Sequence, residues 1–125
     1  MQIILIGIGG FFGAISRYLI DKIITASQGG SFPLGILFIN ISGSFALGFF
    51  YTATIDRFDI SPELRLMITV GFLGAYTTFS TFSFDSVKLI EDGEVGQALI
   101  NILASVFGGL IALYLGILLA RTFSA

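Results

Sequence analysis

The chain has 125 residues, of which 55% are hydrophobic and only 11% are charged, with a formal net charge of −2. Soluble domains contain about 25% charged residues, so this composition excludes an ordinary water-soluble enzyme and indicates an integral membrane protein. The sequence has no Cys and no His, which excludes thiol chemistry and His-ligated metals, and its lack of a basic cluster argues against a nucleic-acid partner.

Four stretches contain no charged residue, namely 1–16, 23–55, 66–84 and 95–120. A membrane-spanning helix needs about 20 apolar residues, and each stretch is close to that length or longer. We therefore predict an all-α integral membrane protein with one domain over residues 1–125. Its four transmembrane helices are expected at about 2–20, 34–55, 62–90 and 95–121. The first stretch is interpreted as a membrane helix and not as a cleaved signal, because no positively charged segment precedes it.

The first expected helix carries Arg17 near its end. Two interpretations of this residue stay open. The side chain can extend along the helix so that the guanidinium reaches the membrane interface. It can equally line a water-filled vestibule and attract anions.

Polar residues also lie inside the second and fourth expected helices. Asn40 interrupts a long apolar run, and a buried amide costs roughly a few kcal/mol unless it finds partners. A helix–helix hydrogen bond would satisfy this amide, and so would a role in binding an ion. Asn101 and Ser105 lie one turn apart on a common face of the fourth helix. Polar groups that follow one face through a membrane indicate a pathway for a polar solute.

The third expected helix contains the run 71–83, in which Thr-Phe-Ser occurs twice in succession. Gly and β-branched Thr are poor helix formers, so we predict a break near Gly74 to Thr78, in the middle of the membrane. Non-helical backbone is tolerated there only when it is buried in protein or faces a cavity. Its freed carbonyls could bind a cation such as Na⁺. The alternative is a kinked helix in which Ser and Thr hydroxyls bond to the main chain.

Phe79 and Phe82 are three residues apart after the expected break and therefore share a helix face. The edge of a phenyl ring is positive, so two edges directed at one point help to hold an anion without a full charge. Ordinary packing is the alternative in a chain with 14 Phe. The donor groups of Asn40, Ser105 and Thr81 favour the anion interpretation, because a hydrated anion needs donors that replace its water.

Small residues recur at steps of four in three of the expected helices. Such stripes let helix backbones approach closely within a bilayer, so we predict a tightly packed bundle that also forms an oligomer. The residues concerned are Gly9 and Gly13 in the first helix, Ser44 and Gly48 in the second, and Ala104, Gly108, Ala112, Gly116 and Ala120 in the fourth.

The charged residues near the helix ends do not specify a single orientation in the membrane. Loops on the cytoplasmic side normally carry an excess of Lys and Arg. Here the tally is equal, which is either noise in a small protein or a sign of dual topology, with copies inserted both ways that pair antiparallel. The basic residues are Arg57, Arg65 and Arg121 on one side and Arg17, Lys22 and Lys88 on the other.

Asp85 lies one turn beyond Phe82 in the third expected helix. It is interpreted either as a solvated charge at the helix end or as a vestibule residue.

These motifs resemble the Fluc (CrcB) family of fluoride channels over nearly the whole chain. The resemblance rests on the Gly-rich first helix with Arg17, on the run 35–40 that ends in Asn40, and on the highly specific run 71–83. It implies a passive, fluoride-selective channel that exports the anion across the plasma membrane and rejects chloride. It also implies an antiparallel dual-topology homodimer with two pores and a structural Na⁺ at the dimer interface.

The resemblance further implies roles for single residues. The main-chain carbonyls of Gly74 and Thr77 would hold the Na⁺. Two positions depart from the family pattern, because Gly109 lacks the hydroxyl that relatives often carry and Asn101 replaces an aromatic or hydroxyl-bearing residue. The remaining residues that the family pattern assigns are Asn40, Phe79 and Phe82 in the pore, Asn101, Ser105 and Gly109 on the fourth helix, and Arg17 and Asp85 in the vestibule.

Two other functions are weighed against the channel. A small four-helix drug–proton antiporter has similar length and topology, but its proton coupling calls for an acidic residue buried within a span, and none lies at the middle of a span here. A non-transporting assembly subunit would leave Asn40 and the doubled Thr-Phe-Ser run without a task. No nucleophile–base pair or metal cluster is visible, so we predict that the chain is not an enzyme.

Overall fold

A computed structural model describes residues 1–123 of the chain, which are helical throughout apart from short connections. The helices α1 (Gln2–Ser27), α2 (Leu34–Asp56) and α6 (Val95–Thr122) are continuous. Between α2 and α6 the chain forms α3 (Pro62–Leu66), a π-helix η1 (Met67–Leu73), α4 (Gly74–Tyr76) and α5 (Phe79–Glu91). Four spans are long and apolar enough to cross a membrane, with α3 to α5 forming the third. This confirms the predicted all-α membrane architecture.

The boundaries agree with the predicted ones within a residue or two, except at the end of the first span. That span was expected to stop near Ile20, but α1 continues to Ser27. Charge alone does not end a helix, and the hydroxyl of Thr25 donates to the Asp21 carboxylate one turn earlier at 3.3 Å. The Ser27 hydroxyl donates to the carbonyls of Ile23 and Ile24, which closes the last turn.

The third span begins with a regular cap and is interrupted once. The side chain of Ser61 accepts a hydrogen bond from the main-chain N–H of Leu64, and Pro62 occupies the first helical position. The helix then stops at Thr77 and Thr78, whose backbone is extended, and resumes at Phe79. The predicted break is therefore confirmed. Gly74 itself is helical, with φ −63° and ψ −37°, so the interruption falls on the two Thr and not on the glycine.

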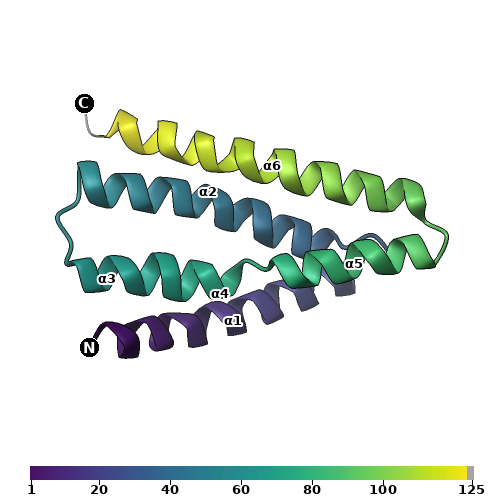
Figure 1. Cartoon of the computed structure of the whole chain (residues 1–125), viewed down its shortest axis with the longest axis horizontal. Helices are drawn as coiled ribbons and strands as arrows, with labels where there is room; N and C mark the ends of the chain where they lie inside the picture. Colours follow the sequence, from purple (N-terminus) through teal and green to yellow (C-terminus); the bar gives the residue numbers. More distant parts are fainter. Residues whose placement is uncertain (124–125) are drawn as a thin grey trace.

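The two halves of the third span pack against different helices. The half before the break lies along α1, whereas α5 packs mainly against α6 (Figure 1). The remaining large contact joins α2 to α6. The start of α1, the end of α6 and the α2–α3 connection lie at one end of the bundle, and the α1–α2 and α5–α6 connections lie at the other (Figure 1).

Glycines bring the helix backbones together at the positions that the small-residue stripes predict. A Cβ atom at Gly9 or Gly13 of α1 would fall on a main-chain carbonyl of η1. A Cβ atom at Gly48 of α2 would fall on the Leu113 carbonyl of α6, and one at Gly116 would fall on the Phe45 carbonyl of α2. The predicted tight packing is thus confirmed within the chain, while the predicted oligomer stays a prediction.

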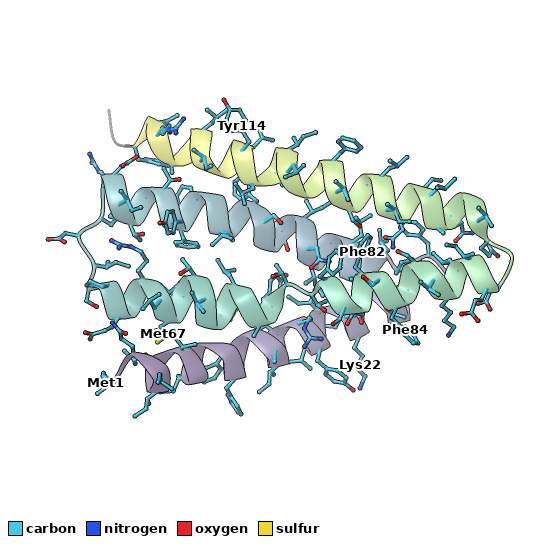
Figure 2. All side chains as sticks on the ribbon, in the orientation of Figure 1. Met1, Lys22, Met67, Phe82, Phe84 and Tyr114 are labelled. Carbon is cyan, nitrogen blue, oxygen red and sulfur yellow. The ribbon has the colours of Figure 1, made fainter. Side chains whose placement is uncertain are left out.

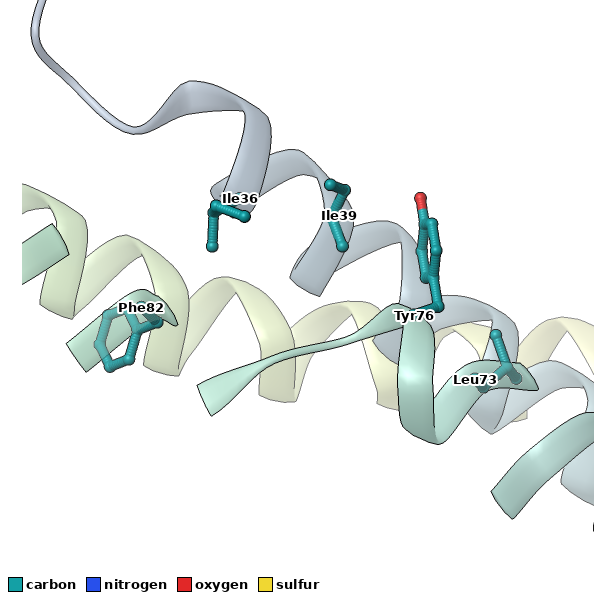
Figure 3. Close-up of a cluster of buried hydrophobic side chains, with 5 residues drawn as sticks. All are labelled: Ile36, Ile39, Leu73, Tyr76 and Phe82. Atoms are coloured by element: carbon teal, nitrogen blue, oxygen red, sulfur yellow. The ribbon is translucent and has the colours of Figure 1, made fainter. Parts of the chain in front are cut away.

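The interior of the bundle is small and lies beside the break. Ile36 and Ile39 of α2 pack there with Leu73 and Tyr76 from before the break and Phe82 from after it (Figure 3). Many other large apolar side chains point outward along the bundle, including Phe84 and Tyr114 (Figure 2). An apolar exterior of this kind is stable in lipid and not in water.

Candidate functional site

A hollow of about 330 Å³ lies between α2, the third span and α6, beside the break. It unites most of the residues that the sequence singled out. The lining residues among them are Asn40, Phe79, Phe82 and Ser105 of the predicted anion pathway, together with Gly74 and Thr77 of the predicted cation site. No Asp, Glu, Lys or Arg of the described chain contributes to this lining.

Asn40 is bonded to the break itself. Its Nδ2 donates to the main-chain carbonyl of Thr78 at 3.0 Å, and its Oδ1 accepts from the Thr78 N–H at 2.8 Å. The helix–helix hydrogen bond that the sequence left as an alternative is therefore present. One N–H of Nδ2 remains for another acceptor in the hollow, because an amide nitrogen carries two.

The two phenylalanines stand in the first turn of α5. Their ring centroids are 5.7 Å apart with an interplanar angle of 53°. Phe82 is buried, with 9% of its surface exposed, whereas Phe79 is 78% exposed. The hydroxyl of Thr78 accepts from the Thr81 N–H and caps this turn, which fixes the start of the helix that carries both rings.

Asn101 and Ser105 are on one face of α6, as predicted, but only Ser105 lines the hollow. Asn101 is 2% exposed and lies between α5 and α6, where its Nδ2 donates to Ser86 Oγ at 3.0 Å. Ser105 Oγ donates to Asn101 Oδ1 at 3.5 Å. Gly109 does not line the hollow, and an ideal Cβ atom built on it would lie 3.6 Å from Ser44 Oγ.

The three remaining predicted residues lie outside this hollow. Thr81 and Asp85 line a second hollow of about 340 Å³ at the end of the bundle, with Asp21, Lys88 and Asp92. Arg17 lines neither hollow. Its Nε donates to the main-chain carbonyl of Ala75 at 3.1 Å, so it ties α1 to the last turn before the break.

The carbonyls at the break can be accounted for individually. The Leu73 carbonyl accepts from both the N–H and the hydroxyl of Thr77, and the Ala75 carbonyl accepts from Arg17. Within residues 1–123 no hydrogen bond reaches the carbonyls of Gly74 and Thr77. No group of three or more His, Cys, Asp or Glu in the described chain could hold a metal. The carbonyl oxygens of Gly74 and Thr77 are thus uncharged oxygen acceptors that have no hydrogen-bond partner among the described residues.

Sequence reasoning missed two residues near the site. Ser44 lines the hollow, and its hydroxyl makes no hydrogen bond within residues 1–123. Its spacing of four from Asn40 places both on one face of α2, which is the signal that could have identified it. Ser86 is buried behind the hollow, and a lone Ser in a helix gives no such signal because it usually bonds to its own backbone.

Comparison with known proteins gives matches over nearly the whole chain. Residues 4–117 match the model of a family described as CrcB-like protein, Camphor Resistance (CrcB). The fluoride-specific ion channel FluC 1 of Moorella thermoacetica is 45% identical over 97% of this chain and 86% of its own length. The fluoride-specific ion channel FluC of Methanococcus aeolicus is 48% identical over 97% of this chain and 96% of its own. The protein of the same name from Hydrogenovibrio crunogenus is 43% identical over 98% of this chain and 93% of its own.

Proposed function

The chain belongs to the CrcB-like family, and on that premise we propose that it is a channel through which fluoride crosses the membrane passively. The observation that carries this proposal is the hollow at the break. N–H and O–H donors and two phenyl rings line it, and no charged side chain of the described residues does. A small anion needs such donors to replace its hydration shell, and a fixed cation would retain it.

Membership of this family confirms the resemblance found in the sequence and the expectation that the chain is not an enzyme. Together with the four spans, it identifies a multi-pass protein of the plasma membrane. The drug–proton antiporter is disfavoured further by the hollow, because proton coupling would need a carboxyl group there and none of the described residues supplies one.

Each lining group has a role in this proposal. The free N–H of Asn40 and the hydroxyl of Ser105 donate to the anion, with Ser44 as a third donor. The positive edges of Phe79 and Phe82 complete the lining where the anion has lost most of its water. Thr81 and Asp85 belong to the mouth of the pathway, because they line the second hollow at the bundle end. Asn101 does not line the hollow, and its role in this proposal is to accept the hydrogen bond of the Ser105 hydroxyl.

We further propose that two copies assemble antiparallel and that the dimer contains two pores. The equal division of basic residues between the bundle ends supports this arrangement. The exposure of Phe79 also supports it, since 78% of a pore-lining ring is left uncovered in a single chain. A second copy against this face would close the hollow.

A structural Na⁺ at the dimer interface fits the donor set at the break. The carbonyls of Gly74 and Thr77 are hard oxygen donors that accept no hydrogen bond within the described residues, and unwound backbone of this kind suits Na⁺. The ion would supply a positive charge that fixes the break and attracts anions. Hydrogen bonds hold the backbone before and after Thr77. Arg17 bonds to the Ala75 carbonyl, and Asn40 bonds to the main chain of Thr78.

The physiological direction in this proposal is export. In acid surroundings HF enters cells and dissociates, and the fluoride formed leaves through the channel down its gradient. The direct test is efflux from liposomes that contain the purified protein, followed with a fluoride electrode and, in parallel, a chloride electrode. Fast fluoride efflux without chloride efflux is expected. Well-folded protein that releases neither anion would overturn the proposal.

A further inference from the structure

A chain of hydrogen bonds runs behind the hollow and connects two of its lining residues. From Ser105 it passes to Asn101 at 3.5 Å, then from Asn101 to Ser86 at 3.0 Å, and from the Ser86 hydroxyl to the main-chain carbonyl of Phe82 at 2.8 Å. Ser105 and Phe82 line the hollow, whereas Ser86 and Asn101 do not and are 4% and 2% exposed. Two buried polar residues thus join α5 to α6 at the level of the hollow.

The bond that holds the Ser105 hydroxyl differs from most hydroxyl hydrogen bonds within the described helices, although the Thr25 hydroxyl near the end of α1 also donates to a side chain. Four hydroxyls of the third span donate to the main-chain carbonyl four residues earlier, at 2.8 Å for Thr69, 2.9 Å for Thr77, 3.0 Å for Ser83 and 2.8 Å for Ser86. Ser105 donates instead to a side chain, Asn101 Oδ1, at 3.5 Å. An O–H···O bond is usually about 2.7–2.8 Å long, so this one is weak.

We propose that Asn101 is a positioning residue that keeps the Ser105 hydroxyl off its own backbone and weakly bonded, so that it is free to turn to fluoride. This inference rests on the proposed function. A hydroxyl bonded to its backbone must break an ordinary hydrogen bond before it donates to an anion, whereas Ser105 gives up only a long one. The bond from Asn101 to Ser86 holds the amide in place while Ser105 turns away.

The first test compares fluoride efflux rates over a range of fluoride concentrations. Asn101→Leu removes the side-chain acceptor, so the Ser105 hydroxyl bonds to the carbonyl of residue 101 as its counterparts do. The apparent KM for fluoride should rise about fivefold, which corresponds to roughly 1 kcal/mol, the usual size of one hydrogen bond. Gln97→Leu, an amide loss on the same helix outside the chain of bonds, should leave the KM unchanged.

The same substitution in a Ser105→Ala background separates positioning from a structural effect. Asn101 acts through Ser105 in this proposal, so Asn101→Leu should not raise the KM further once the hydroxyl is gone. A rise of equal size in both backgrounds would overturn the proposal. Ser86→Ala serves as a second variant that leaves Asn101 in place but unanchored, and it should raise the KM in the same direction.

A second test does not depend on conduction. The chain contains only two Asn residues, Asn40 and Asn101, so selective isotope labelling gives the signals of only two side-chain amide groups in an NMR spectrum, and Asn101→Leu assigns them. Sodium fluoride, but not sodium chloride, should shift the Asn101 signal, and Ser105→Ala should abolish that shift. A signal that ignores fluoride, or that shifts equally without Ser105, would overturn the inference. A Ser105-dependent shift in a protein that does not conduct would overturn the proposed channel function alone.

Discussion

Asn40 of α2 exchanges two hydrogen bonds with the main chain of Thr78, the residue directly before the third span resumes as a helix at Phe79. The extended backbone at Thr77 and Thr78 deprives this N–H and C=O of ordinary helical partners, and a single amide replaces them. One side chain on a continuous helix therefore fixes the geometry of the broken one. In the proposed channel it also positions the start of α5, where both phenyl rings stand.

We expect Asn40→Leu to lower the free energy of unfolding by about 1–3 kcal/mol, because two main-chain groups lose their partners inside the bundle. Fluoride flux should fall with it, since the start of α5 is no longer held. Thermal unfolding in detergent and liposome efflux measure the two effects. Ser44→Ala is the matched control for stability, because Ser44 lies one turn along the same face and makes no hydrogen bond within residues 1–123. An unfolding midpoint equal to that of the unsubstituted protein would contradict the role assigned to Asn40.

Phe79→Ile and Phe82→Ile should each reduce fluoride flux at least tenfold, because an aliphatic side chain lacks the positive ring edge. The two variants should differ in stability. Phe82 is buried in the small core, so its replacement leaves a cavity, whereas Phe79 is largely exposed in the single chain. Phe84→Ile, an exposed position on the same helix outside the hollow, is the control for flux. Normal flux in both pore variants would refute the ring-edge role.

Gly48→Ala should destabilise the bundle by about 1–3 kcal/mol, the usual cost of forcing extra atoms into a packed interior. The added methyl group meets the main-chain carbonyl of Leu113, and backbone cannot move aside as a flexible side chain can. Gly7→Ala is the control, since nothing lies within 4 Å of the new Cβ atom there. The comparison is made by thermal unfolding in detergent. Equal midpoints for the two variants would mean that α2 and α6 are not held this closely.

Arg17→Lys distinguishes a hydrogen bond from a charge. Lysine preserves the positive charge of α1 but not the guanidinium Nε that donates to the Ala75 carbonyl. If fluoride flux depends on the hydrogen bond from Arg17 to the Ala75 carbonyl, Arg17→Lys and Arg17→Gln should reduce the flux to a similar extent. Lys22→Gln, an exposed charge further along α1, should have little effect. Flux that survives in the lysine variant and is lost only in the glutamine variant would favour electrostatic attraction instead.

The sequence predicted the four spans and the break because both are local properties. Apolar length determines the spans, and the adjacent β-branched Thr77 and Thr78 resist helical backbone. The register of one helix against another is not local, and that is where prediction fell short. The spacing of Asn101 and Ser105 does not reveal that Ser105 lines the hollow whereas Asn101 faces α5. The same holds for Arg17, whose partner at Ala75 is 58 residues away in the chain.

The interrupted third span also bears on how the protein enters the membrane. Its second half, α5, has 13 residues, so at about 1.5 Å per residue it is roughly 20 Å long, short of the roughly 30 Å of hydrocarbon that a span must cross. The 15 residues from Pro62 to Tyr76 fall short as well. This span also has the lowest mean hydropathy of the four. During biogenesis neither half can insert by itself, so the insertion machinery has to accept 62–91 as one unit, and α1, already in the bilayer, offers the first half a surface on which to dock.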